Sequence, residues 1–580
     1  MNRYSSDFET STWEKGKTHV WAWANCNIET EEIQTGTNLK DFIEFAKKEK
    51  NAVFYLHNLK FDGEFIIYWL FMNGYEFVKK PQDARDNTFT ALINSMGEFY
   101  NIVIFFKVGS KVKKATFLDS LKIIPFPVED IPKYFGLDIK KLSIDYHAER
   151  NEDHQLTFQE IEYISNDVLI VARALRKIFA EGKIRMTQSS IALADYTDMV
   201  GYSKFKHYFP EMVFQIDKDI RRAYKGGFTY LNPIYEGKEV GKGTCIDVNS
   251  LFAYCQRNFS MPYGDPLFFD GEYKKDVVYN LYIQMITCSF KLKPNKIPTI
   301  QIKDSMHFLP TEYITGTDGH IVCLILTNID LKLFFDHYIV EDLKFECGWK
   351  FKGIQGIFNE YVDYWYNKKC EATVENNKGM RTIAKLRLCS LYGKFASSME
   401  IQNKSPYIAR DGAVHYKLEE SEIVKGVYIP VSAFVTAYAR DLIIRTSQKI
   451  RDYSLKKYGK DLYYYSDTDS AHCGLSVEEL KEICEIDDLK LGAFKVENTF
   501  KRARYVKPKC YIQELEDDKL KIVCSGLPKD CYSQVEWDNF KLGFSCNEKL
   551  VYSHVRGGVK LKKSTFTINE KYSRELLFNF

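Results

Sequence analysis

Two aspartates at the end of an aromatic run constrain this chain more than any other feature. Residues 463–470 read Tyr-Tyr-Tyr-Ser-Asp-Thr-Asp-Ser, which predicts a short strand that reaches a tight turn and reverses. Side chains at i and i+2 of an extended segment project to the same side, so Asp467 and Asp469 place two negative charges in a small volume. That crowding favours a hard divalent cation such as Mg²⁺, which prefers oxygen ligands. A polar hairpin tip is the alternative, because aspartate is common in turns.

The composition indicates a large multidomain protein. The chain has 580 residues, of which 45% are hydrophobic and 15% aromatic, enough for several packed domains. The formal net charge is +3, so any indication of nucleic-acid binding has to come from local clusters. We expect neither a signal peptide nor a membrane span, because no sufficiently long apolar run occurs. The 14 cysteines show no zinc spacing, and we expect reduced thiols rather than a disulfide framework.

Four carboxylates in the first third of the chain come from three predicted elements. They are Asp7 and Glu9 on a first strand, Asp62 just after a strand over 52–56, and Asp167 on a helix over 158–174. Tyr163 shares the helix face of Asp167 because the two are four residues apart. Two divalent ions held by such a set can activate a water and stabilise a leaving oxygen, while a phenol orients the water. A lone D-x-E is usually solvated surface, but the ordered set predicts metal-dependent hydrolysis.

Residues 378–392 show the clearest helical periodicity. Arg381, Lys385, Cys389 and Tyr392 are spaced by four, four and three, so they share one helix face, and an apolar stripe lies opposite. Two cations and an aromatic ring suit a nucleoside triphosphate, with charge for the phosphates and a ring for the base. A solvated basic face is the alternative.

Several other segments have recognisable patterns. Strands are predicted over 278–290 and 321–326, a hairpin excursion over 398–428 and a long amphipathic helix over 429–450. Residues 500–511 carry five cations among aromatic side chains, a pattern suited to phosphate contacts.

Taken in chain order, these motifs resemble those of the protein-primed family B DNA polymerases of small linear-genome bacteriophages, the phi29-like group. The D-x-E, N-x-x-x-D and Y-x-x-x-D sets are similar to the three exonuclease motifs of proofreading polymerases, with Asn58 opening the second. Residues 247–253 resemble D-x-x-S-L-Y-P, 385–393 resemble K-x-x-x-N-S-x-Y-G, and 509–511 resemble K-x-Y.

Three positions depart from the family pattern. Phe252 stands where the family has Tyr and Ala253 where it has Pro. Phe252 keeps the ring that the family uses as a steric gate against a ribose 2′-hydroxyl, so ribose exclusion is expected to survive. Cys389 stands where Asn is usual, which removes the polar contact of that position.

The resemblance implies an α/β and α+β multidomain fold. A ribonuclease H-like 3′–5′ exonuclease domain is followed by a right-hand polymerase with palm, fingers and thumb and with two insertions. The expected divisions are 1–185 for the exonuclease domain, 186–257 for the first part of the palm, 258–356 for a first insertion contacting terminal protein and template, 357–397 for the fingers, 398–428 for a second insertion serving strand displacement and processivity, 429–524 for the second part of the palm, and 525–580 for the thumb.

The resemblance also assigns roles by position. Polymerase catalysis falls to Asp247, Asp467 and Asp469, and exonuclease catalysis to Asp7, Glu9, Asp62, Tyr163 and Asp167. The metal ligands are Asp247, Val248 and Asp469 in one site and Asp7, Glu9, Asp62 and Asp167 in the other. Each site is expected to hold two Mg²⁺, which Mn²⁺ can replace.

Substrate-binding roles follow in the same way. Nucleotide binding falls to Phe252, Lys368, Lys369, Arg381, Lys385 and Tyr392. DNA binding falls to Asn58, Phe61, Phe65, Ser120, Leu121, Lys141, Tyr224, Gly226, Gly227, Ser250, Gly393, Lys509 and Tyr511. For Phe61 and Phe65 core packing is an equal alternative, and the two glycines after Tyr224 could form an ordinary β-turn.

The function implied is DNA-directed DNA synthesis that replicates a linear phage genome from a protein primer, with strand displacement and 3′–5′ proofreading. Expected partners are template and primer DNA, dNTPs and a terminal protein, with the chain acting as a monomer or 1:1 heterodimer in the cytoplasm of an infected bacterium. A stand-alone exonuclease with a degenerate polymerase region would not keep Asp247, Asp467, Asp469 and Lys385. A DNA-binding scaffold would not need two acidic clusters.

Overall fold

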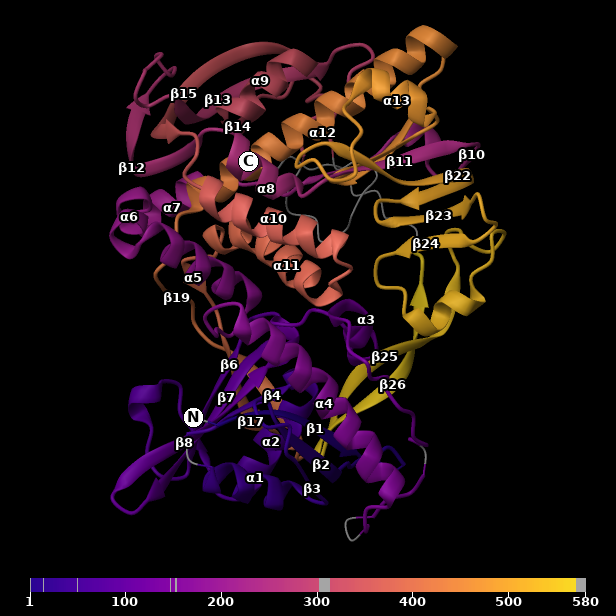
Figure 1. Ribbon diagram of the computed structural model, residues 1–580. Coiled ribbons are helices and arrows are strands. Elements are labelled where there is room, and N and C mark those ends of the chain that lie inside the picture. The colour runs from indigo at the N-terminus through magenta and orange to yellow at the C-terminus, as the bar shows by residue number, and fades with distance from the viewer. Residues whose placement is uncertain are drawn as a thin grey trace.

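The molecule has an N-terminal α/β unit at one end and a larger α+β assembly at the other (Figure 1). The computed structural model describes residues 2–13, 15–49, 51–146, 148–151, 154–301 and 313–569. The predicted first insertion and thumb therefore include residues, 302–312 and 570–580, that lie outside the described part of the chain.

An eight-stranded mixed sheet forms the N-terminal unit, in the order β3-β2-β1-β4-β8-β7-β6-β5. Its strands are β1 (Arg3–Thr10), β2 (Val20–Asn27), β3 (Ile33–Gly36), β4 (Val53–Leu56), β5 (Glu76–Phe77), β6 (Thr88–Ile93), β7 (Phe99–Val108) and β8 (Lys111–Asp119). The helices of this unit are α1 (Leu39–Lys48), α2 (Leu59–Met72), α3 (Ile131–Phe135) and α4 (Phe158–Ala180). Helix α4 begins with a capping box between Thr157 and Glu160 and packs against β1 and β2.

A second sheet is the platform of the larger assembly, in the order β24-β23-β22-β11-β21-β20-β9, with β10 paired to β22. Its strands are β9 (Phe228–Leu231), β10 (Glu239–Val240), β11 (Gly243–Val248), β20 (Tyr463–Thr468), β21 (Ser470–Cys473), β22 (Phe494–Lys507), β23 (Cys510–Leu515) and β24 (Leu520–Cys524). Helix α12 (Ile429–Tyr458) packs against β20 and is buried along most of its length.

Helices and a smaller sheet complete this assembly. The helices are α5 (Gln188–Val200), α6 (Tyr202–Tyr208), α7 (Phe214–Arg221), α8 (Leu251–Asn258), α9 (Asn328–His337), α10 (Asn359–Val374), α11 (Lys378–Phe395) and α13 (Val477–Ile483). The four-stranded sheet is β12 (Met261–Asp270), β15 (Tyr338–Ile354), β13 (Leu281–Leu292) and β14 (Val322–Thr327) in spatial order. Helix α11 packs against α5, α10 and α12 and also contacts α3 and α8.

The predicted elements are confirmed with shifted ends. The helix predicted over 158–174 extends to Ala180, that over 378–392 to Phe395, and that over 429–450 to Tyr458. The two predicted strands lie at β13 and β14. Residues 398–428 form short antiparallel pairs, β16 (Glu400–Ile401) with β19 (Glu422–Ile423) and β17 (Lys404–Ile408) with β18 (Val414–Leu418). The mixed α/β and α+β fold class is therefore confirmed.

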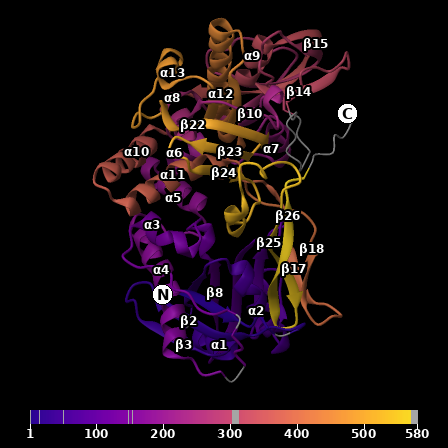
Figure 2. The ribbon, with the colours of Figure 1, turned by 90° about the vertical axis from the view of Figure 1, so that its right-hand side faces the viewer.

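The last hairpin, β25 (Ser545–Val555) with β26 (Gly558–Thr567), crosses from the larger assembly to the N-terminal unit. Figure 2 shows it beside the β17–β18 hairpin, and β18 contacts β25 directly. At its turn the amide of Thr18 donates to the carbonyl of Arg556 over 2.9 Å. Gly557 has φ +96°, and a Cβ there would meet the carbonyl oxygen of Thr18 at 1.7 Å, so this close approach requires glycine.

A polar junction joins this hairpin, β18 and helix α2. Glu64 of α2 is buried, accepts a hydrogen bond from the Tyr416 hydroxyl over 2.7 Å and lies 3.6 Å from Nδ1 of His554. The nearby Glu64 carboxylate raises the pKa of His554 above its ordinary value of 6.5, although burial and Lys60 oppose the shift. Asp411, whose carboxylate pairs with His415, also favours the charged form of His554.

This junction is expected to weaken as the pH rises. A folded-state pKa above the unfolded value means that protonated His554 stabilises the contact below about pH 6.5, and that this contribution is lost as the pH rises through the folded pKa. His554→Gln should cost about 0.5 kcal/mol of local stability at pH 6 and little at pH 8.5. Hydrogen-exchange protection of residues 545–567 measures this, with His207→Gln on exposed α6 as the control. Equal losses at both pH values would contradict it.

The expectation that all cysteines are reduced thiols is wrong for one pair. Cys531 and Cys546 form a disulfide that ties a 3₁₀ turn at Lys529–Gln534 to the start of β25. Both belong to a small apolar core at the base of the hairpin, and the closed loop spans 15 residues. No sequence motif predicts this pair, because the bond forms only where two separate segments meet in the fold.

Each described helix is too short or too polar to cross a bilayer.

Candidate active sites

Three adjacent strands of the second sheet bring the aspartates of the β20–β21 hairpin beside Asp247. β11 pairs with β21 so that Asp247 lies opposite the residue that follows Asp469. The turn is closed by the Asp469 amide, which donates to the Asp467 carbonyl over 2.7 Å, and Thr468 adopts a positive φ of 63°. The Val248 amide donates to the Asp469 carbonyl over 2.8 Å, which ties the hairpin to the end of β11.

The electrostatics of this cluster favour a bound cation. The pKa of Asp469 is raised to about 7, first because burial disfavours the carboxylate and second because Asp247 lies close, with Asp467 adding to the effect. Carboxylates that destabilise each other's charge are typical of a site that a positive ion completes. Lys495 already supplies one such charge, since its Nζ lies 2.9 Å from Oδ1 of Asp247.

The two hairpin aspartates have different surroundings. Asp467 accepts hydrogen bonds from Nζ of Lys509 over 2.6 Å and from the hydroxyl of Thr229 over 3.1 Å. Lys509 has φ +57°, and its amide donates to the hydroxyl of Tyr465 over 2.9 Å. The ring of Tyr511 packs on Tyr465 with centroids 5.5 Å apart and is largely buried. Asp467 is thus neutralised by the protein itself, whereas Asp469 faces Asp247.

Helix α11 presents its cationic face to this cluster. Arg381 and Lys385 are exposed, and the ring of Tyr392 stacks on Phe252 with centroids 4.0 Å apart. Cys389 is exposed on the same face, near Lys385, Asp469 and Asp247. Gly393 is exposed with open space around it.

The two lysines of α10 point to different partners. Lys369 donates to the hydroxyl of Ser250 over 3.0 Å, and its pKa is lowered to about 8 by burial and then by Lys495. Ser250 takes φ +54° at the start of α8. Lys368 instead forms an ion pair of 2.8 Å with Glu181.

Sequence reasoning missed one anchor of α11. Arg387 is fully buried, pairs with Asp195 of α5 over 2.7 Å and donates to Gln188 over 2.6 Å. The guanidinium carbon of Arg387 lies 5.4 Å from the centroid of the Trp365 ring. A basic residue on the apolar side of a helix was the available signal, since it needs a buried partner.

The second acidic cluster lies where β1, α2 and α4 meet. It contains Asp7 and Glu9 of β1, Asp62 in the first turn of α2, and Asp167 of α4. The pKa of Asp7 is raised to about 7 by burial and then by Asp167, and the pKa values of Glu9, Asp62 and Asp167 are raised as well, in each case first by burial. The four side chains therefore share one water-poor volume.

Tyr163 and Lys141 border this cluster. The Lys141 ammonium lies 3.1 Å from Oδ2 of Asp167. Burial raises the pKa of Tyr163, so its phenol stays protonated, and its hydroxyl is 2.6 Å from that of Tyr146. Tyr146 was not predicted, although it lies near Lys141 in the sequence. Asp119 was missed too; it accepts from three amides, those of Asn58, Leu59 and Leu121, and so shapes the loop before α2.

The predicted primer-end residues are only partly exposed. Asn58 has φ +77°, and its side-chain amide donates to the Tyr552 hydroxyl of β25 over 3.1 Å. Ser120 is buried against His57 at 3.1 Å, while Leu121 is half-buried. Phe61 is half-buried, but Phe65 is 1% exposed. Core packing thus describes Phe65 in this structure.

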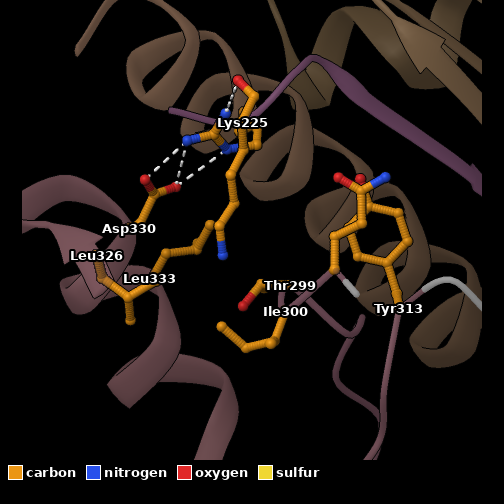
Figure 3. A pocket seen from close by; sticks show the side chains of 9 residues that line it. Lys225, Thr299, Ile300, Tyr313, Leu326, Asp330 and Leu333 are labelled. Atoms are coloured by element: carbon orange, nitrogen blue, oxygen red, sulfur yellow. Dashed lines mark hydrogen bonds and ion pairs between the residues drawn. The ribbon is translucent and has the colours of Figure 1, made fainter. Parts of the chain in front are cut away.

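The Tyr224-Lys225-Gly226-Gly227 loop is held by a buried arginine. Nη1 of Arg440 donates to the carbonyls of Lys225 and Gly226, each over 2.8 Å, and Arg440 also pairs with Asp330. Lys225, Asp330 and Arg440 help to line a small pocket that the Lys225 side chain enters (Figure 3). Neither glycine has a positive φ. A Cβ at Gly227 would lie 2.7 Å from Thr468, so this position requires glycine for close approach to the β20–β21 turn.

Both clusters fit divalent ions by the chemistry of their donors. Oδ1 of Asp62 and Oδ1 of Asp167 are buried without a hydrogen-bond partner. As the described side chains stand, no three His, Cys, Asp or Glu residues are arranged as a complete ligand set. Lys141 and Lys495 each hold a carboxylate oxygen that an ion would need. The carboxylates are hard oxygen donors, the type preferred by Mg²⁺ and Mn²⁺.

Comparisons with known proteins agree with this geometry. Residues 44–483 match the family described as DNA polymerase type B, organellar and viral. The chain is 40% identical to the DNA polymerase of Bacillus phage B103 over 97% of this chain and 99% of that protein. It is 39% identical to the DNA polymerase of Bacillus phage phi29, covering 97% and 98%. It superposes on phi29 DNA polymerase in a ternary complex with primer-template DNA and incoming nucleotides at a TM-score of 0.90, with 39% identity, covering 98% of this chain and all (100%) of that one.

The chain therefore belongs to the type B DNA polymerases of organelles and viruses. Within that family it is a phi29-like phage DNA polymerase, and its multidomain α/β architecture matches that of its phi29 relative. Members of this family use divalent metal ions, and the two acidic clusters are the places in the described chain that suit them.

Proposed function

We propose that the chain extends a DNA primer along a template with dNTPs, using Asp247, Asp469 and the Val248 carbonyl to hold two Mg²⁺. The observation that carries this is the raised pKa of Asp469 beside Asp247, opposite the cationic face of α11. The phi29 relative solved with primer-template DNA and nucleotides supports DNA and dNTPs as the ligands. Mn²⁺ would serve as well, because the donors are all oxygens.

The protein side chains would position the substrates for an in-line attack of the primer 3′-hydroxyl on the α-phosphate. When bound, two divalent ions at each site would neutralise charge developing on the phosphate and the leaving oxygen. Lys385, Arg381 and Lys369 would hold the triphosphate, and Lys385 would stabilise the pyrophosphate as it leaves. The Phe252–Tyr392 stack would form the floor beneath the sugar and base. Lys368 is the weakest of the proposed nucleotide ligands, because Glu181 already pairs with it.

Asp467 would support the site indirectly. Its ion pair with Lys509 holds the start of β23 against the hairpin, and Lys509 and Tyr511 would then present the primer end. Tyr224, Gly226, Gly227, Ser250 and Gly393 complete the proposed DNA contacts around this site.

The cluster of Asp7, Glu9, Asp62 and Asp167 would hydrolyse the primer end from its 3′ side. Tyr163, kept protonated by its burial, would orient the attacking water, and Lys141 would contact the scissile phosphate. Asn58, Phe61, Ser120 and Leu121 would hold the frayed end, with Phe65 supporting Phe61 from the core.

The proposed division into an exonuclease domain, palm, fingers, thumb and two insertions keeps the boundaries given above. The second insertion and the thumb hairpin meet at β18 and β25, an arrangement that would enclose DNA and favour strand displacement and processivity. Priming from the hydroxyl of a terminal protein, and work in the cytoplasm of an infected bacterium, follow from the family alone.

The function is tested with a primed oligonucleotide duplex, four dNTPs and either Mg²⁺ or excess chelator. We expect full extension with Mg²⁺ and none with chelator. A primer left unextended at every Mg²⁺ and Mn²⁺ concentration would contradict the proposal.

Replacing Cys389 with asparagine is expected to strengthen nucleotide binding. The amide would add a hydrogen bond that the thiol makes only weakly, which corresponds to about a threefold lower KM for dNTPs. Single-nucleotide incorporation kinetics measure this, and Cys389→Ala separates the gain of an amide from the loss of a thiol. An unchanged KM would mean that this departure from the family is neutral.

A further inference from the structure

One lysine outside every family motif lies directly on a carboxylate of the polymerase cluster. Lys495 is a cross-strand partner of Asp247 in the antiparallel pair β11–β22. Its Nζ is 2.9 Å from Oδ1 of Asp247. Side chains of directly opposed residues lie close on one face of the sheet, so the strand register itself keeps the ammonium within reach of Asp247.

The register is secured on both sides of this pair. The neighbouring partners, Val248 with Phe494 and Ile246 with Val496, are apolar, and Phe494, Val248 and Ile246 are buried. A slip by one residue would turn these side chains out of the core and move the lysine to the other face. The position of Lys495 is therefore fixed by the packing of its apolar neighbours in the core.

The charge of Lys495 acts on the whole cluster. It opposes the rise in the pKa of Asp469 and is the second cause, after burial, of the low pKa of Lys369. Lys495 thus lies close to both the acidic pair and Lys369. The side chains of Lys495 and Asp247 are 40% and 21% exposed, so the pair can open without unfolding the sheet.

The exonuclease cluster contains a similar pair. Lys141 lies 3.1 Å from Oδ2 of Asp167, one of its four carboxylates. Each acidic cluster thus carries a lysine on one of its proposed metal ligands, Asp247 in one and Asp167 in the other, and Lys509 pairs with the supporting Asp467 in addition.

We propose that Lys495 is a positioning residue that serves as the resident counter-ion of Asp247 and competes with divalent ions for its carboxylate. This inference rests on the proposed function of Asp247 as a metal ligand. Lys495 pairs with Asp247 and orients its carboxylate while no ion is bound, and it must leave Oδ1 when an ion binds there. The Lys495–Asp247 pair weakens metal binding, because an incoming ion must first displace the ammonium from the carboxylate.

The test measures Mn²⁺ binding directly, with electron paramagnetic resonance reporting the concentration of the free ion. The full chain carries Asp7→Ala and Asp167→Ala, so that the polymerase cluster dominates the signal. Lys495→Met removes the charge and keeps the length of the side chain, and we expect about fivefold tighter Mn²⁺ binding. Lys495→Arg, which keeps the charge, should bind Mn²⁺ as the parent does.

A matched control is Lys519→Met, which removes a surface lysine that pairs with Asp517 over 2.6 Å. It should leave Mn²⁺ affinity unchanged, which shows that net charge alone is not responsible. Equal or weaker binding by a folded Lys495→Met protein would overturn the proposal, and so would tighter binding by Lys495→Arg. Failure of the parent to extend a primer would instead count against the proposed function.

Discussion

Replacing Asp469 with alanine is expected to abolish nucleotide incorporation, by about a thousandfold or more, while degradation of single-stranded 3′ ends continues. The reason is geometric: the β11–β21 pairing places Asp247 opposite the residue after Asp469, so the two carboxylates concentrate negative charge at one point, which also raises the pKa of the buried Asp469. Without Asp469 that charge is halved, and the ions that balance the triphosphate lose a ligand. Incorporation and exonuclease rates are measured on the same labelled primer.

Asp467→Ala is the matched control for this prediction. Asp467 is only two residues away, but it is neutralised by Lys509 and bonded to Thr229. We expect a smaller loss of incorporation together with weaker binding of the primer end, because Lys509 loses its partner. Persistent extension by Asp469→Ala would show that the metal ligand assigned to the hairpin is wrong.

The double replacement of Asp7 and Asp167 with alanine is expected to have the reverse effect. Exonuclease activity should fall by about a thousandfold or more, because two of four carboxylates are lost, while incorporation on a paired primer is retained. Folding should not suffer, since the pKa values of these buried acids are raised and their repulsion is relieved by the change. Thermal unfolding of the same protein checks that point.

Glu162→Ala is a suitable comparison for the double variant. Glu162 lies on α4 between Tyr163 and the start of the helix, but it is exposed on the opposite side from the cluster. It should keep both activities. Loss of polymerisation in the double variant would indicate that the two clusters do not act independently.

The sequence was sufficient to predict elements and site residues where local patterns and motif order agree. The periodicity of residues 378–392 predicted α11 and its cationic face, and the aromatic run before Asp467 predicted β20 and its turn. The i, i+2 spacing of Asp7 and Glu9 on a strand, and the i, i+4 spacing of Tyr163 and Asp167 on a helix, predicted that each pair shares a face. Family resemblance then indicated which distant segments meet.

Other features depend on contacts that no local pattern encodes. Lys495 reaches Asp247 through strand register, Arg387 finds Asp195 across two helices, and Tyr552 of the last hairpin meets Asn58. The Cys531–Cys546 bond likewise requires the turn and the hairpin to pack together. Sequence spacing also treated Phe61 and Phe65 alike, whereas only Phe65, which lies against Gly558 at the turn of the hairpin, is fully buried.

Primer extension on singly primed circular single-stranded DNA, with Mg²⁺ and no accessory protein, tests the central claim most directly. A single chain that polymerises, encloses DNA between the second insertion and the thumb hairpin, and displaces the strand ahead should make products longer than one circle. Products that stop at one circle would contradict the proposed strand displacement, and no extension at all would contradict the assignment of the polymerase site.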